Sequence, residues 1–194
     1  MGYRDLVRID SPGATGELRI GRGRPIEVVC PTQEGNRVWT RKAAGVPVEL
    51  DLDLGGRRWC VEARGVTDET CGYHPRHTVW SWSAGVGAAT DGRALGWNLV
   101  AGINDPPTGS ERAIWLDGEP YEPAPVAFDG LDAIDFADGS RLAFAAEAER
   151  SRDENRLVVR SRYRQPFGRF AGTLPGGVEL GHGLGVMEHH DAVW

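Results

Sequence analysis

The stretch of residues 46–56 reads VPVELDLDLGG, in which apolar and polar side chains alternate and two glycines follow. Side chains of a strand point alternately to opposite faces, so residues 46–54 are predicted to form a strand that is half buried and half exposed to water. Gly55-Gly56 supplies the positive φ angles of a two-residue hairpin turn. The chain is therefore expected to turn back into an antiparallel strand over residues 57–63.

The same turn chemistry recurs along the chain, at Asp91-Gly92, Asp117-Gly118, Asp138-Gly139 and Pro175-Gly176-Gly177. Five such signals predict nine or ten antiparallel strands, most of them joined to their sequence neighbours. The 27 Gly and 12 Pro residues also favour tight turns over long helices. The predicted fold is all-β, an antiparallel barrel or sandwich with at most one short helix.

That one helix would lie in residues 143–155 (AFAAEAERSRDEN), which are helix formers throughout. A strand through Glu147 followed by a charged loop is the alternative. Residues 1–16 are predicted to form an N-terminal arm, and residues 17–194 a single β-barrel domain, because no change in composition marks a second one. Short strands are expected at residues 17–20 and 26–30.

The formal net charge of −6 argues against nonspecific nucleic-acid binding and, more weakly, against docking on anionic lipid. No apolar run is long enough for a membrane span, and residues 1–10 lack the apolar core of a secretion signal. Cys30, Cys60 and Cys71 are odd in number and unrelated in spacing, which is typical of reduced thiols in a cytoplasmic protein. No cofactor is predicted.

The first candidate site is residues 68–85, DETCGYHPRHTVWSWSAG. If residues 74–82 form one strand, five side chains share a face: His74, Arg76, Thr78, Trp80 and Trp82. Arg and His beside two indoles would be costly in a dry core, and they suit a partly wet cavity. The alternative is a barrel interior that the Trp pair fills, with Arg76 paired to a carboxylate at the rim.

The second candidate site is the C-terminal stretch of residues 183–194, GLGVMEHHDAVW. On a strand, Glu188, His190 and Trp194 share a face. Glu188 and His190 could form a carboxylate–imidazole pair that acts as a general acid or base. A salt bridge at the rim, with no chemistry, is the alternative.

A metal site is ranked below these interpretations. His74 and His77 lie at an odd offset, as do His189 and His190, so each pair would point to opposite strand faces. A site would need His74, Glu188 and His190 together, and nothing in the spacing demands it. Other polar candidates for a cavity lining are Asn98 and Glu111.

The order of the motifs resembles a bacterial family called domain of unknown function 2804 (DUF2804), over residues 35–194. The residues that carry the likeness are RVWTRK (37–42), DETCGYHPRHT (68–78), WSW (80–82), GWNL (96–99), GINDP (102–106), SE (110–111), QPFG (165–168) and EHHDAVW (188–194). That family is similar to the lipocalin-like group of carotenoid hydratases and tocopherol cyclase. The resemblance implies a calycin-type β-barrel and a hydrophobic ligand, terpenoid or acyl in kind. Longer relatives carry a further β region ahead of the matched part, so a homodimer could complete the cavity here.

Three functions remain open. The first is a barrel that binds a hydrophobic small molecule, with Arg76, Trp80, Trp82, Asn98, Glu111 and Trp194 as binding residues. The second is an acid–base hydratase, isomerase or cyclase on the same cavity. In it Glu188 or Asp68 donates a proton, His190 or His74 accepts one, and the two indoles stabilise a cation. The third is a protein-interaction module with an exposed sheet edge.

Overall fold

The computed structural model describes residues 5–32 and 34–194, and within these residues every regular element is a strand. No helix in this part of the chain has the length and apolar character needed to cross a membrane. The strands are β1 (Asp5–Ser11), β2 (Ala14–Ile20), β3 (Ile26–Pro31), β4 (Arg37–Leu54), β5 (Arg57–Gly72), β6 (His77–Ala89), β7 (Ala94–Ala101), β8 (Ala113–Leu116), β9 (Glu119–Tyr121), β10 (Ala127–Asp129), β11 (Ala133–Asp135), β12 (Arg141–Arg156), β13 (Val159–Leu174) and β14 (Val178–Val193).

All five predicted turns join antiparallel neighbours: β4 to β5, β6 to β7, β8 to β9, β11 to β12, and β13 to β14. At each turn a glycine has positive φ; Gly55 and Gly56, for example, lie at 59° and 86°. These conformations are open to glycine without a Cβ clash.

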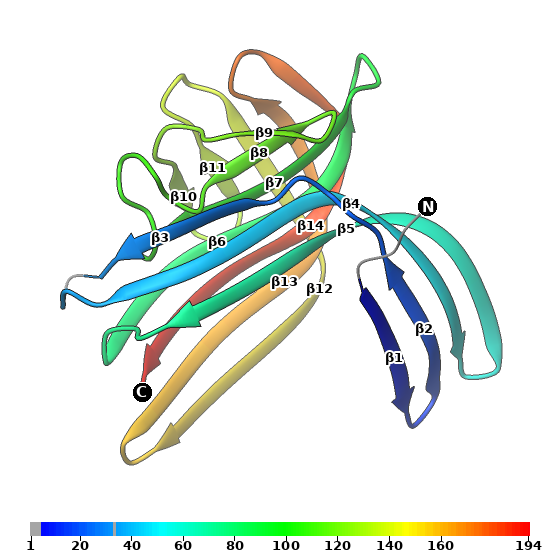
Figure 1. Cartoon of the computed structure of the whole chain (residues 1–194), viewed down its shortest axis with the longest axis horizontal. Helices are drawn as coiled ribbons and strands as arrows, with labels where there is room; N and C mark the ends of the chain where they lie inside the picture. Colours follow the sequence, from blue (N-terminus) through cyan, green and yellow to red (C-terminus); the bar gives the residue numbers. More distant parts are fainter. Residues whose placement is uncertain (1–4, 33) are drawn as a thin grey trace.

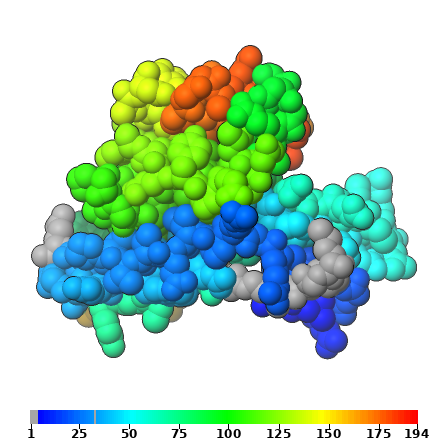
Figure 2. Space-filling model, turned by 45° about the horizontal axis from the view of Figure 1, so that its top comes forward, coloured from blue at the N-terminus to red at the C-terminus, as the bar shows by residue number. Residues whose placement is uncertain are grey.

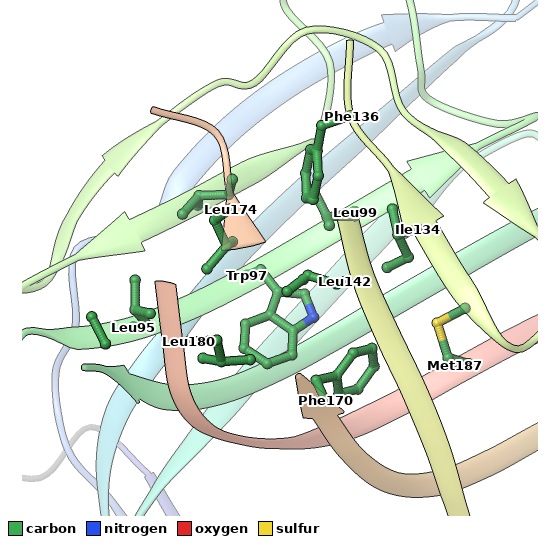
Figure 3. Packing of buried hydrophobic residues seen from close by; sticks show 12 residues of the cluster. Leu95, Trp97, Leu99, Ile134, Phe136, Leu142, Phe170, Leu174, Leu180 and Met187 are labelled. Atoms are coloured by element: carbon green, nitrogen blue, oxygen red, sulfur yellow. The ribbon is translucent and has the colours of Figure 1, made fainter. Parts of the chain in front are cut away.

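The larger sheet has nine strands in the order β10-β11-β12-β13-β14-β6-β7-β8-β9 and curls strongly (Figure 1). Ile114 of β8 and Ile134 of β11 come from opposite ends of that order, yet both lie in one buried apolar cluster with Trp97. The sheet therefore wraps around a core as a half-barrel (Figure 3). The prediction of an all-β, lipocalin-like antiparallel fold is confirmed.

The smaller sheet has five strands built on β4. β5 pairs along one edge of β4, while β2 and β3 pair in succession along the other. β4 and β5 contact β6, and β4 also contacts β7 and β8, so the smaller sheet lies across one face of the larger one (Figures 1 and 2). Ala44 of β4 packs there on Ala113 and Trp115 of the larger sheet, and Trp115 Nε1 donates to the carbonyl of Arg24 at 2.7 Å.

The far halves of β4 and β5, with β1 and β2, extend beyond the larger sheet (Figure 1). Burial consequently fades along the strand predicted at residues 46–54, from Val46, which is 2% exposed, to Leu54, which is 46% exposed. Residues 5–16, within the predicted N-terminal arm, form β1 and the start of β2; residues 1–4 lie outside the described part. The division into an arm and one domain stays a prediction.

Residues 143–155 form neither of the predicted alternatives, because β12 is a continuous strand through Arg156. It pairs with β13 from Leu142 to Arg156, with a register shift between Ala146 and Ala148. Hydrogen bonds between the two strands stabilise its charged half: Arg162 donates to Asp153, and Arg164 donates to Glu149. Tertiary pairing here overrides a helix propensity that is worth only tenths of a kcal/mol per residue.

Candidate functional site

A cavity of about 390 Å³ lies between the two sheets, and we call it the Trp cavity. Its walls come from both sheets and from the segments between β5 and β6 and between β7 and β8. The lining residues are Lys42, Asp68, Thr70, His74, Trp80, Trp82, Val100, Ile103, Asn104, Glu111, Gln165, Glu188 and Trp194.

Strand alternation explains why the cavity lies on this face of β7. Trp97 and Leu99 point into the apolar core of the half-barrel, so Asn98 and Val100 point the other way, toward β4 and β5. Asn98 is fully buried, accepts from Trp82 Nε1 at 2.9 Å and donates to the Glu111 carbonyl at 2.8 Å. Asn98 therefore supports the cavity wall, and it is not one of the lining residues.

Lys42 is the buried cation of the Trp cavity. Its side chain is 4% exposed, and its Nζ donates to Asp68 Oδ1 and lies 3.5 Å from Glu111 Oε2. β4 supplies Lys42, β5 supplies Asp68, and the segment before β8 supplies Glu111. Ionic groups taken out of water need partners, and this cluster provides them for the ammonium group.

Glu111 is as buried as Lys42 and accepts a hydrogen bond from Asn104 Nδ2 at 3.1 Å. Burial raises the pKa of its carboxyl above the ordinary glutamate value, although Lys42 and Asn104 oppose that shift. The surrounding segment is held by Arg112, which is 1% exposed and donates to the carbonyls of Asp105 and Pro106. Glu111 is thus a rigidly placed acid beside a lysine.

Glu188 is the third acid of the cavity, after Asp68 and Glu111, and is half-buried on β14. It accepts hydrogen bonds from Trp80 Nε1 at 2.9 Å and from Gln165 Nε2 at 2.5 Å. Burial raises the pKa of Glu188, and this outweighs the two donors, which lower it. The two donors, one to each oxygen, fix the orientation of the carboxyl.

His74 lies in the segment between β5 and β6, and burial lowers the pKa of its imidazole. Its Nδ1 is buried and has no hydrogen-bond partner within the described part of the chain. The ring is therefore neutral at pH 7.

The structure gathers seven of the ten predicted site residues around the cavity: Asp68, His74, Trp80, Trp82, Glu111, Glu188 and Trp194. Asn98 does not line the cavity, but it accepts a hydrogen bond from the lining residue Trp82. Arg76 is exposed, because β6 begins only at His77 and residues 73–76 form a loop instead of the predicted strand start.

His190 is the third residue outside the lining, and it does not form the predicted pair with Glu188. Its Nε2 lies 3.0 Å from Ser161 Oγ, and its ring packs on Trp80 with centroids 4.3 Å apart. Glu188 and His190 do share a face, as predicted, but both contact Trp80 rather than each other. Burial lowers the pKa of His190, so the ring supports Trp80 as a neutral group.

Lys42 is the main residue that the sequence interpretation missed. Val38, Thr40, Lys42 and Ala44 share one face of β4 and all are buried, but that burial is known only from the structure. A lysine on such a face indicates a buried cation that needs an acidic partner.

A metal site would have required His74, Glu188 and His190 together. Across residues 5–32 and 34–194, His, Cys, Asp and Glu side chains form no group of three that could hold a metal ion. The three cysteines are unpaired. Burial raises the pKa of the Cys30 thiol to about 11, so that thiol is protonated at neutral pH.

Comparison with known proteins identifies the family. A family model described as domain of unknown function (DUF2804) matches residues 7–194. No curated protein matches the chain. Among solved structures, the chain is similar to a putative AttH protein from Nitrosomonas europaea, with 13% identity, a TM-score of 0.46 and coverage of 94% of this chain and 63% of that one. It is also similar to kievitone hydratase from Nectria haematococca, with 10% identity, a TM-score of 0.48 and coverage of 97% and 64%. The chain spans less than two thirds of either structure.

Proposed function

The chain belongs to the DUF2804 family, and we propose that it binds a mostly apolar small molecule, terpenoid or acyl in kind, with its polar group inside the Trp cavity. One observation carries this proposal: polar groups from β4, from β14 and from the segment before β8 converge on a cavity whose wall also includes three tryptophans and two aliphatic side chains. Lys42, Glu111 and Glu188 supply the polar groups, and Trp82, Val100 and Ile103 supply apolar wall. A volume of about 390 Å³ is within the range of small-molecule sites.

The binding prediction concerns Trp82, whose indole is half-buried in the wall. Replacing Trp82 with Leu is expected to weaken binding of the amphipathic dye 1-anilinonaphthalene-8-sulfonate by about tenfold, because an aromatic wall surface is lost. Dye fluorescence measures the affinity. The matched control is Trp59→Leu on β5, a tryptophan outside the cavity and 40% exposed. Equal weakening in both variants would place the dye elsewhere, and the cavity proposal would then be wrong.

A native mass spectrum tests the same proposal without a chosen probe. A lipid-sized mass that leaves the wild-type chain on mild denaturation is expected. The same mass should be depleted in Trp82→Leu and retained in Trp59→Leu.

Acid–base catalysis is the second candidate function, and the environment of Glu188 favours it. A protonated Glu188 could give its proton to a carbon–carbon double bond, the faces of Trp80 and Trp82 could stabilise the resulting cation, and water could then attack. Neutral His74 could take the proton that the water loses. Such a reaction needs His74 deprotonated and Glu188 protonated, so its rate would fall as the pH rises through the raised pKa of Glu188.

The titration of Glu188 can be measured directly. Carboxyl ¹³C NMR of glutamate-labelled protein is expected to show two resonances that titrate above the ordinary value of about 4.3. One should disappear in Glu188→Gln and the other in Glu111→Gln. A Glu188 resonance that titrates at the ordinary value would remove the general acid from this candidate mechanism.

A further inference from the structure

The turn between β12 and β13, Leu157-Val158, carries the two most exposed of the large aliphatic side chains in the described part of the chain. Leu157, Val158 and Val159 are 104%, 67% and 42% exposed. The two strands project from the larger sheet as a long hairpin with this turn at its tip (Figure 1). Nothing in the fold buries these three side chains, so burial within the chain does not explain them.

Turn geometry does not explain them either. Leu157 has a φ of 54°, in the left-handed region, which costs about 1–2 kcal/mol for a residue with a Cβ. Two-residue hairpin turns favour Asn-Gly or Asp-Gly, and this chain uses Asp117-Gly118 at the β8–β9 turn. An exposed leucine in that conformation breaks a local rule with no compensation inside the fold, and such positions are often functional.

The hairpin is also basic, although the whole chain has a net charge of −6. Residues 150–164 contain six arginines and two acidic residues. Two further carboxylates, Asp191 and Glu149, pair with Arg160 and Arg164, so positive charge remains in excess. Arg152 and Arg156 pair with Glu154, and Arg162 pairs with Asp153, but these arginine side chains remain 53%, 76% and 63% exposed.

The hairpin tip and the Trp cavity are at the same end of the molecule. Arg160, next to the tip, pairs in register with Val193. Trp194 follows Val193, lines the cavity and is 51% exposed. Its backbone N–H donates to the carbonyl of Arg76. Tyr73, which is 79% exposed, lies in the same loop as Arg76. Two exposed aromatic side chains thus accompany the apolar tip.

We propose that this end of the molecule docks on an anionic lipid bilayer, with the Leu157–Val159 tip inserted below the headgroups. Arginine binds phosphate through paired donors, and each basic residue near an anionic bilayer contributes about 1 kcal/mol. Tyr and Trp are enriched at the level of the headgroups, where Tyr73 and Trp194 would lie. A narrow apolar tip with arginines on both faces fits a fluid surface better than a flat protein surface.

Vesicle flotation of the purified chain tests the docking. The chain is expected to float with phosphatidylcholine vesicles that contain about 30% phosphatidylglycerol, to bind pure phosphatidylcholine much less, and to be released by about 0.5 M salt. The test variant is Leu157→Asn/Val158→Gly. It removes the apolar tip and installs a favoured turn dipeptide, so the hairpin stays folded while vesicle affinity falls about tenfold or more.

The matched control is Leu54→Asn, at the β4–β5 turn on a different extension of the molecule, where the side chain is 46% exposed. Its vesicle binding should equal that of the wild type. No flotation of the wild type, or equal flotation of the tip variant, would overturn the proposal. So would self-association through the tip without vesicle binding. Dye binding in the Trp cavity, measured without vesicles, should be unchanged in the tip variant, which separates this inference from the proposed function.

Discussion

Replacing Lys42 with Met is expected to lower the free energy of unfolding at pH 7.5 by about 3–5 kcal/mol, because a buried carboxylate loses its cation. Glu111 is 4% exposed and lies 3.5 Å from the Lys42 ammonium. Asp68, the other partner of Lys42, is 39% exposed and can be solvated by water. Most of the loss should therefore come from Glu111. Urea denaturation followed by tryptophan fluorescence measures it.

The pH dependence of that loss has a definite sign. Burial already raises the folded-state pKa of Glu111, and removal of Lys42 raises it further. A folded state with a raised carboxyl pKa binds the proton more tightly than the unfolded state does, so stability is lost as the pH rises. The difference in the free energy of unfolding between Lys42→Met and the wild type should be small near pH 4.3, the ordinary glutamate value. It should grow as the pH rises, up to the raised pKa of Glu111 in the folded variant.

A double variant isolates the cause. Lys42→Met/Glu111→Gln removes the cation and the anion together, and the amide oxygen of Gln can still accept from Asn104 Nδ2. Most of the lost stability should return, and the pH dependence should flatten. The exposed pair of Arg58 and Asp51 offers a control, since Arg58→Met should cause a much smaller loss. A double variant as unstable as Lys42→Met would mean that lost packing, rather than an unpaired charge, explains the effect.

Replacing Trp97 with Ala is expected to cost about 3–5 kcal/mol, the range for an aromatic residue deleted from a core. Trp97 is fully buried, its ring packs edge-on against Phe170 with centroids 5.0 Å apart, and its Nε1 donates to Ser83 Oγ at 3.1 Å. Chemical denaturation measures the loss. Trp59→Ala, which truncates an exposed tryptophan, should cost far less.

Gly85 lies directly against the Trp97 indole, so a second substitution can test the packing of that ring. A Cβ at Gly85 would lie 2.2 Å from Cζ2 of the Trp97 indole, so Gly85→Ala should destabilise the wild-type chain. In a Trp97→Ala background the same methyl group enters the vacated space, and Gly85→Ala should be neutral or stabilising. Additive losses in the double variant would show that the indole does not lie against Gly85.

The hairpins could be predicted from the sequence because their chemistry is local. Gly55-Gly56 and Asp117-Gly118 adopt left-handed φ angles that few other dipeptides tolerate, whatever surrounds them. The turn between β12 and β13 lacks that signal and was not predicted. The β12–β13 turn uses Leu157-Val158, and the interpretation of residues 143–155 was wrong there because pairing with β13 outweighs propensity.

The candidate site was predictable only in part. The two indoles stood out because they share a predicted strand face with His74 and Arg76, and Glu188 stood out because it shares a predicted face with His190. Glu188, Trp80 and Trp82 do line the Trp cavity. His190 was expected to pair with Glu188, but in the structure its Nε2 forms a hydrogen bond with Ser161 Oγ. Which hydrogen-bond partner a side chain takes depends on the neighbouring strand, and β13 is the neighbour here.

The sequence by itself determined the all-β class, the five glycine turns and the strand face that presents Trp80 and Trp82, because φ preferences and alternation act over a few residues. Only the tertiary structure decided that Lys42 lies beside Glu111, far away in the sequence, and that the basic hairpin tip lies at the same end as Trp194. Those placements depend on how two sheets pack and how one sheet curls. Packing of this kind is set by many weak contacts between distant residues, and no local pattern encodes it.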